Sequence, residues 1–306
     1  MKETVYNLFA YTSKELIHEI GGVSHETSGN DEEKRHFLQE NVEVDHPRAL
    51  RRHLPTPVSV DRYIAMTRLG RQLELFNAVL SDLGAPRDIL YCATLIDEGL
   101  PRIDVAVGTG NLRAMDLLPP NYPVVGDVPD WLTMYSSGRG LDIGQLIRDD
   151  YFSATVVLFQ SGHYVSCVKL LVSFVDTVAF LTFGDDPGVF TKWLNQYADL
   201  SKIRVTADEL WEMRNSILHM TSLDSRKVLG GKVRRVGFCV APRGHCSPPE
   251  PHMEYFNLLD LVDTIAQAVE KWALEFNSDG EKLITFVMRY DRLLSDHRKT
   301  AVLPKS

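Results

Sequence analysis

Residues 206–221, TADELWEMRNSILHMT, form the clearest helical pattern in this 306-residue chain. Thr206 is a favourable N-cap, and Glu209 follows it at the spacing of a capping box, in which each side chain binds the backbone N–H of the other residue. Val205 and Leu210 have the spacing of a hydrophobic staple around this box. Apolar residues recur behind the cap at intervals of three and four: Leu210, Met213, Ile217 and Met220, with Trp211 and Leu218 beside them. The pattern predicts an amphipathic helix whose apolar stripe is buried in a core.

Three polar residues lie beside this stripe: Arg214, Asn215 and His219. At 3.6 residues per turn, Asn215 and His219 lie about one turn apart on one side of the helix. Arg214 and His219 are roughly 140° apart around the axis, at about 100° per residue. One helix therefore does not focus both side chains on one atom. Two copies packed side by side would line a groove with two arginines and two histidines.

The hexapeptide 214–219, RNSILH, resembles the Arg-x(4–6)-His motif of HEPN domains, including the polar residue directly after the arginine. Its surroundings are also similar to those in the family, because apolar helical segments precede and follow it: 151–160, 164–181, 189–200 and 253–276. This order resembles the up-and-down helical bundle of HEPN proteins, with the motif on a late helix. The resemblance covers residues 148–276.

The resemblance implies a metal-independent endoribonuclease that cleaves RNA through its own 2′-hydroxyl and leaves a 2′,3′-cyclic phosphate. His219 would be the general acid or base, Arg214 the phosphate ligand, and Asn215 the residue that orients His219 or the scissile phosphate. These residue types suit the reaction, since histidine exchanges protons near neutral pH and arginine offers a planar fork to phosphate oxygens. HEPN active sites usually form from two motifs at a dimer interface, so a homodimer is implied, and no metal or other cofactor is needed.

The same resemblance leaves a second interpretation open. Many HEPN-like domains are non-catalytic, and the alternative function is a dimerisation module or an RNA- or protein-binding module. In either case the resemblance suggests a prokaryotic toxin–antitoxin or phage-defence protein, with RNA and an antitoxin or regulatory protein as partners. The N-terminal part would then sense, restrain or target the activity.

Composition restricts the class of protein. The chain is 44% hydrophobic with a net charge of -8, so a nucleic-acid site must be a local patch rather than an overall basic field. Four cysteines without CxxC spacing do not form a secreted disulfide framework. The first 22 residues lack a signal-peptide pattern, and the most apolar run, 165–181, is interrupted by Lys169 and Asp176. We expect a cytoplasmic protein without a membrane partner.

The first half gives weaker signals. We expect a helix over residues 5–20 that ends at Gly21–Gly22, a linker or surface loop over 24–57, and a helix over 58–83. Strands are predicted at 89–96 and 103–107, the second followed by Gly108–Thr109–Gly110, which favours a plain turn over a nucleotide-binding loop. The Pro- and Gly-rich stretch 117–140 is expected to be a connector packed on the bundle.

Residues 163–183 are nearly all apolar, which predicts the central helix of the second half, and Asp176 within it favours a structural hydrogen bond over a catalytic role. Residues 225–249 contain six cations and no acid. Gly230–Gly231 divides them as a β-hairpin would. Two interpretations remain open, an arm that grips phosphate and a solubilising hairpin or surface for an acidic partner. The cations assigned to RNA binding are Arg226, Lys227, Lys232, Arg234 and Arg235.

A zinc site from Cys239, His245, Cys246 and His252 is disfavoured because the spacing fits none of the usual ligand pairs. Helices at 253–276 and 281–296 complete the bundle. The predicted fold is mainly α. Residues 1–145 form a small mixed α/β or α+β region, and residues 146–306 form a HEPN-like up-and-down bundle with an inserted β-hairpin.

Overall fold

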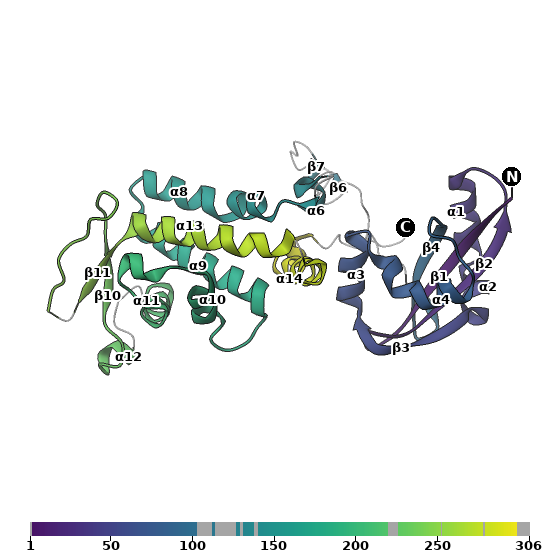
Figure 1. Ribbon diagram of the computed structural model, residues 1–306, viewed down its shortest axis with the longest axis horizontal. Helices are drawn as coiled ribbons and strands as arrows, with labels where there is room; N and C mark the ends of the chain where they lie inside the picture. The colour runs from purple at the N-terminus through teal and green to yellow at the C-terminus, as the bar shows by residue number, and fades with distance from the viewer. Residues whose placement is uncertain are drawn as a thin grey trace, which may run out of the picture. The chain divides into compact units, whose positions relative to one another are not determined.

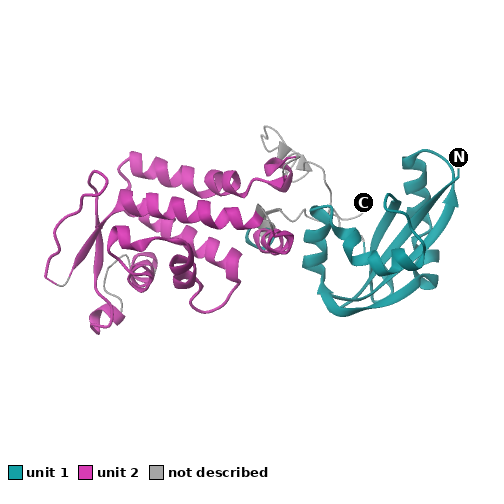
Figure 2. Ribbon diagram, viewed as in Figure 1, with its two compact units in different colours: residues 1–130, 291–306 teal, residues 131–290 magenta. Residues whose placement is uncertain are grey.

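The computed structural model describes residues 2–102, 112–113, 127–128, 131–137, 140–219, 226–251, 253–277 and 279–298. The chain divides into two compact units (Figure 2). Unit 1 comprises Met1–Asp130 and Asp291–Ser306, and unit 2 comprises Trp131–Tyr290. Unit 1 contains a five-stranded mixed sheet, so the protein is α/β, and the prediction of a mainly α fold is wrong.

The sheet of unit 1 has the strand order β3-β2-β1-β4-β5 (Figure 1). Strand β1 is antiparallel to β2 and parallel to β4, with Val5 opposite Leu90, and the β2–β3 and β4–β5 pairs are antiparallel. The bounds of the strands are β1 Glu3–Ser13, β2 Leu16–Thr27, β3 Leu50–Ser59, β4 Leu90–Asp97 and β5 Leu100–Arg102. The strand predicted at 89–96 is confirmed as β4.

The helix predicted over residues 5–20 is wrong, because this segment forms the β1–β2 hairpin. Lys14 and Glu15 join the two strands with φ angles of 51° and 59°, the backbone of a two-residue hairpin turn. Residues 5–10 of β1 are all buried, since both faces of the strand are covered. A strand buried on both faces shows no alternation of polar and apolar residues, so its apolar positions matched a helical period by coincidence.

The linker predicted at 24–57 is also wrong. It holds the end of β2, helix α1 (Asp31–Glu40), the short helix α2 (Val42–Asp45), the 3-10 turn η1 (His46–Arg48) and β3. Helix α1 is capped at its N-terminus by Asn30, whose side chain forms a capping box with Glu33. Its polar composition reflects exposure, since only Lys34 and Leu38 are buried along it.

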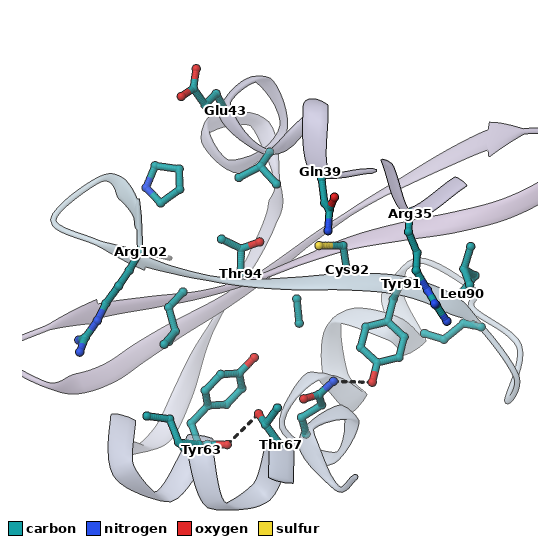
Figure 3. A pocket seen from close by; sticks show the side chains of 17 residues that line it. Arg35, Gln39, Glu43, Tyr63, Thr67, Leu90, Tyr91, Cys92, Thr94 and Arg102 are labelled. Atoms are coloured by element: carbon teal, nitrogen blue, oxygen red, sulfur yellow. Dashed lines mark hydrogen bonds between the residues drawn. The ribbon is translucent and has the colours of Figure 1, made fainter. Parts of the chain in front are cut away.

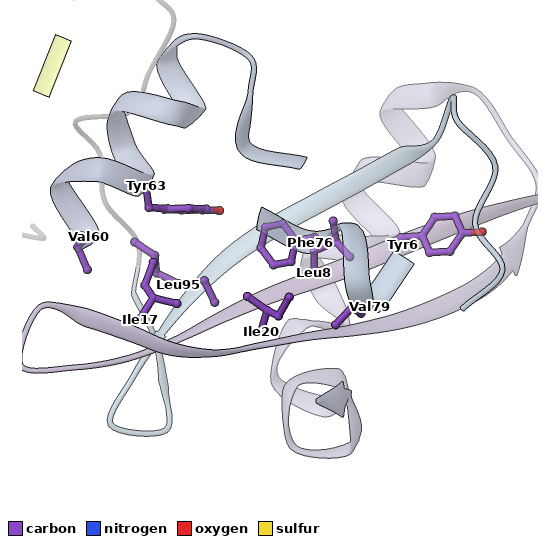
Figure 4. Packing of buried hydrophobic residues seen from close by; sticks show 10 residues of the cluster. Tyr6, Leu8, Ile17, Ile20, Val60, Tyr63, Phe76, Val79 and Leu95 are labelled. Carbon is purple, nitrogen blue, oxygen red and sulfur yellow. The ribbon is translucent and has the colours of Figure 1, made fainter. Parts of the chain in front are cut away.

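Each face of the sheet has its own core. Leu8 and Ala10 of β1 contribute to the larger cluster, which also includes Tyr63 and Phe76 (Figure 4). Phe9 packs with Val42 and Ile96 in the other cluster, as the alternation of side chains along a strand requires. The larger cluster is covered by α3 (Val60–Arg68), η2 (Gln72–Phe76) and α4 (Asn77–Asp82). The single helix predicted at 58–83 is therefore three pieces, divided around Gly70, whose φ is 70°.

Unit 2 is built around the 20-residue helix α9, against which α8, α10, α11 and α13 pack (Figure 1). The length and apolar composition of α9 would also suit a membrane span, but nine of its side chains are buried within the unit. The helices predicted around 151–160, 164–181, 189–200 and 281–296 are confirmed with shifted ends. The bounds are α6 Trp131–Tyr135, α7 Ile143–Ile147, the π-helical turn η4 Arg148–Phe152, α8 Ser153–Gln160, α9 Tyr164–Phe183, α10 Val189–Tyr197, η5 Leu200–Ile203, α11 Ala207–His219, α12 Arg226–Leu229, α13 Leu258–Leu274, η6 Glu275–Asn277 and α14 Gly280–Arg298. The residues of α14 from Asp291 onward belong to unit 1.

The predicted β-hairpin in residues 225–249 is wrong. Its first arm is the helical turn α12, and its second arm leads into β10 (Val236–Cys239). Strand β10 pairs in parallel with β11 (Glu254–Asn257), so the connection is a crossover rather than a tight turn. The helix expected from residue 253 begins only at Leu258, after the N-cap Asn257.

The short pairs β6 (Leu112–Arg113) with β7 (Asp127–Val128), and β8 (Ser136–Ser137) with β9 (Gly140–Leu141), lie near the unit boundary along the chain. The predicted strand 103–107, the Gly108–Gly110 turn and most of the connector 117–140 lie outside the described residues. Trp131, one of the described residues of that connector, is buried and packs on Phe286 and Tyr290.

Replacing Phe76 with alanine should lower the free energy of unfolding of unit 1 by about 3–5 kcal/mol, because this ring is fully buried in the larger cluster. All four tryptophans (131, 193, 211 and 272) belong to unit 2, so tryptophan fluorescence reports unit 2 and far-UV circular dichroism reports both units. In a denaturant titration, the part of the circular dichroism transition that comes from unit 1 should move to lower denaturant concentration. The transition followed by tryptophan fluorescence should stay unchanged. Leu100→Ala, at a position that is 72% exposed, is the matched control. Equal effects of the two substitutions would contradict the assigned core.

Candidate functional site

Helix α11 begins as the sequence predicts. The Thr206 N–H donates to Glu209 Oε2 at 2.8 Å, and the Glu209 N–H donates to Thr206 Oγ1 at 3.2 Å, which completes the capping box. Leu210, Met213 and Ile217 are buried, so the predicted apolar stripe faces the core. Both predictions are confirmed, and they determine which side of the helix faces outward.

Arg214 is held in place by groups from two helices. Its Nε and Nη2 atoms each lie 2.7 Å from Oδ2 of Asp176 on α9, and Nη1 donates to Asn215 Oδ1 at 2.9 Å. The guanidinium carbon lies 5.0 Å from the centre of the Trp211 ring, within the range of a cation–π contact. The structural hydrogen bond predicted for Asp176 is therefore confirmed, with Arg214 as its partner.

This arrangement orients Arg214 without removing it from solvent. The side chains of Arg214 and Asp176 are 20% and 29% exposed, so the pair lies at the surface of the bundle and not in its interior. A phosphate group that binds Arg214 has to share the guanidinium with the Asp176 carboxylate or displace it. Asp176 thus fixes the direction of the arginine and also competes with an anionic ligand.

Asn215 and His219 complete the predicted motif. Asn215 is half-buried and its side-chain oxygen accepts the hydrogen bond from Arg214, so in this structure it orients the arginine. His219 is the last residue of α11, and its side chain lies outside the described residues. The assignment of His219 as acid or base remains a prediction.

Two of the predicted RNA-binding cations pair with acids of α11. Lys227 Nζ lies 2.9 Å from Glu212 Oε1, and Arg234 Nε lies 2.5 Å from Glu209 Oε1. These hydrogen bonds raise the pKa of Lys227 and of Arg234. Arg234 also donates to the backbone carbonyl of Arg204. The same Glu209 therefore caps α11 and anchors Arg234.

Of the remaining cations, Lys232 is exposed and Arg235 is half-buried, and the side chain of Arg226 lies outside the described residues. Arg243 pairs with Asp263 at 2.5 Å. Three of the six cations of residues 225–249, Lys227, Arg234 and Arg243, are thus paired with acids from α11, from Glu254 of β11 and from α13. Sequence reasoning missed this compensation because the acids lie 15 to 25 residues away along the chain.

Unit 1 contains a polar cluster that no sequence pattern indicated. The carboxylate of Asp45 is fully buried and accepts from Asn7 Nδ2 at 2.8 Å, from Arg48 Nη2 at 2.6 Å and from His25 Nε2 at 2.6 Å. Burial alone would raise the pKa of Asp45, but the hydrogen bonds from Asn7, Arg48 and His25 outweigh it and lower that pKa. The cluster joins β1, β2 and the α2–η1 segment.

An open groove of about 1030 Å³ follows β4 in unit 1 (Figure 3). Helix α1 contributes Arg35 and Gln39, helix α3 contributes Tyr63 and Thr67, and β5 contributes Arg102. The Tyr91 hydroxyl on β4 accepts from Gln72 Nε2 at 2.5 Å. Among the described residues, β4 pairs with β5 only through Leu95–Asp97, and residues 90–94 of β4 line the groove.

Comparison with protein-family models, with curated proteins and with solved structures found no match for this chain. Among the residues that the structure describes, no three His, Cys, Asp or Glu side chains lie close enough to hold a metal ion. The setting of Arg214 between α11 and α9 is the basis for the functional proposal.

The Arg214–Asp176 pair should show an interaction free energy of about 1 kcal/mol, above the few tenths typical of exposed pairs. A double-mutant cycle of Arg214→Met and Asp176→Asn measures it, because methionine retains the aliphatic contact with Trp211. Denaturation followed by tryptophan fluorescence gives the four free energies of unfolding. Additive effects, within about 0.3 kcal/mol, would show that the pair does not hold α11 to α9.

Asp45→Asn should destabilise unit 1 by about 1–3 kcal/mol near neutral pH, because three donors lose a charged acceptor. Because the pKa of Asp45 is lower in the folded protein than in the unfolded chain, its ionised carboxylate stabilises the fold at pH values above the ordinary pKa of about 3.8. This stabilisation is lost as the pH falls through the lowered pKa. The acid-induced loss between about pH 5 and pH 2 should therefore be smaller in the variant than in the wild type. Parallel pH profiles of the free energy of unfolding would contradict this role.

Proposed function

We propose that unit 2 is a metal-independent endoribonuclease of the HEPN type. The observation that carries the proposal is the setting of Arg214, a surface guanidinium oriented by Asp176 and Asn215 on the helix that ends at His219. A cation held in one direction, with part of its surface accessible, suits a phosphate group whose charge grows during reaction.

RNA cleavage needs three groups from the protein, and the RNA itself supplies the nucleophile, which is its 2′-hydroxyl. A base takes the proton of that hydroxyl, an acid protonates the leaving 5′-oxygen, and a cation stabilises the charge on the phosphate. Arg214 would stabilise the phosphate, and His219 would act as acid or base. Asn215 would hold the guanidinium in the plane in which it meets the phosphate oxygens.

A second copy of the chain would supply the other half of the site. Because Arg214 and His219 are roughly 140° apart on one helix, a complete set at one phosphate requires the two residues to come from two helices. A homodimer that places two α11 helices side by side meets this requirement. A toxin or phage-defence role in the cytoplasm, controlled by an antitoxin or regulatory protein, is part of the same proposal.

A second candidate is a non-catalytic dimerisation or binding module, and the pairing of the basic segment favours it over a nuclease that needs a strong RNA-binding surface. The cations assigned to RNA binding include Lys227 and Arg234, and both are paired with acids of α11. Such a surface binds RNA less strongly than the six cations of the segment would suggest, because an acid beside a cation cancels its attraction for phosphate. In this role Arg214 would only tie α11 to α9.

RNA cleavage in the presence of EDTA separates the two candidates. The wild type should cleave single-stranded RNA into fragments that end in a 2′,3′-cyclic phosphate, and His219→Ala should reduce the rate by at least about 100-fold, the lower range for loss of an acid–base group. His163→Ala, a histidine at the N-terminus of α9, is the matched control and should cleave like the wild type. Circular dichroism verifies that all three proteins are folded.

The outcome that would contradict the nuclease is equal cleavage by the wild type and His219→Ala, or intact RNA with both. Salt-dependent binding of intact RNA, weakened by Arg234→Ala with Arg235→Ala and unchanged by His219→Ala, would instead support the binding module.

A further inference from the structure

Two thiols of unit 2 are brought into contact by a folded loop. Strand β10 ends at Cys239, and the chain turns back so that Cys246 returns to the same place. The two Sγ atoms lie 3.0 Å apart, and both cysteines are reduced. This separation is below the roughly 3.5–4.0 Å at which non-bonded carbon atoms pack, and about 1 Å above the length of a disulfide bond.

The loop is held closed by a side chain outside it. The Nδ2 atom of the buried Asn257 donates to the carbonyls of Ala241, Pro242 and His245 at 2.8 to 3.0 Å. The Oδ1 atom of the same residue accepts from the backbone N–H of Leu259 and caps α13. The amide therefore links the shape of the loop to the start of a long helix.

Two further contacts fix the same loop. The backbone N–H of Gly244 donates to the carboxylate of Asp260 at 3.0 and 3.1 Å, and Arg243 pairs with Asp263. Gly244 has a φ of 74°, which a side chain would make costly. None of these contacts involves a cysteine, so the thiols stay together in the reduced protein without a bond between them.

We infer that Cys239 and Cys246 form a reversible redox site that takes low-molecular-weight disulfides as its oxidant. The thiolate of one cysteine attacks a sulfur of the small disulfide, whose S–S bond breaks and releases one small thiol. The second cysteine loses its proton to solvent and attacks the mixed disulfide, which releases the second small thiol. Two protein thiols and one small disulfide become one protein disulfide and two small thiols, with two electrons transferred to the oxidant.

The two cysteines differ in exposure, since Cys239 is half-buried and Cys246 is exposed. A small disulfide can therefore reach the pair from solvent, and the two thiols are close enough for one to resolve a mixed disulfide formed on the other.

A disulfide between Cys239 and Cys246 would respond to the redox state of the surroundings rather than stabilise the fold. A disulfide stabilises chiefly by closing a loop in the unfolded chain, and the short loop between Cys239 and Cys246 gains less than a longer loop would. Exposed disulfides of this kind are the labile ones that respond to the surrounding thiol pool. In a reducing compartment such bonds act mainly as transient sensors.

The test uses the full-length protein in glutathione buffers with an increasing fraction of oxidised glutathione. Free thiols are blocked with N-ethylmaleimide, and the protein is digested with trypsin. Cleavage after Arg243 separates the two cysteines into different peptides, so only a disulfide keeps those peptides together. We expect the linked pair, with Cys92 and Cys167 blocked as free thiols and the linkage lost on reduction. Blocked thiols at both Cys239 and Cys246 at every ratio would overturn the inference.

Single variants test whether the two cysteines act as a pair. In Cys239→Ser and in Cys246→Ser, the remaining cysteine should accumulate bound glutathione, because the resolving thiol is gone. Cys92→Ser is the control and should form the 239–246 disulfide like the wild type. Separate glutathione adducts on both cysteines of the wild type would show that they do not act as a pair.

Discussion

The ion pair between Arg214 and Asp176 is the contact on which the interpretation of unit 2 depends. It joins the motif helix α11 to the central helix α9, and Asn215 and Trp211 complete the setting of the guanidinium. The pair has two opposite effects on a phosphate ligand. Its geometry directs the arginine before a ligand arrives, which lowers the cost of ordering the site, while the carboxylate competes for the same donors.

Charge compensation in unit 2 follows from the same helix. Glu209 and Glu212 lie on α11, and they pair with Arg234 and Lys227 from the segment that follows it. Glu209 also caps the helix, so one carboxylate contributes to the start of α11 and to the anchoring of the basic segment. A basic run in the sequence is therefore a poor measure of surface potential when acids from another element lie against it.

The parts of the fold that were predictable from the sequence are those set by local rules. The capping box of Thr206 and Glu209, the apolar stripe behind it and the long apolar helix α9 each depend on residues within a few turns. The β1–β2 hairpin was missed because β1 is buried on both faces and carries no alternation, and α1 was missed because an exposed helix has a loop-like composition. Of the site, Arg214 and Asn215 were predicted, but the carboxylate of Asp176 lies 38 residues away and only the fold brings it to Arg214.

The central claim is that Arg214 is oriented by Asp176 and remains able to bind phosphate. The most direct measurement is the affinity of a 2′-O-methyl RNA, which cannot be cleaved, for the wild type and for Asp176→Asn. Asparagine retains an oxygen that accepts from the guanidinium but removes the competing charge, so the account predicts tighter binding by the variant, and no such gain when Arg214→Met is added. Equal or weaker binding by Asp176→Asn would contradict a phosphate site at Arg214.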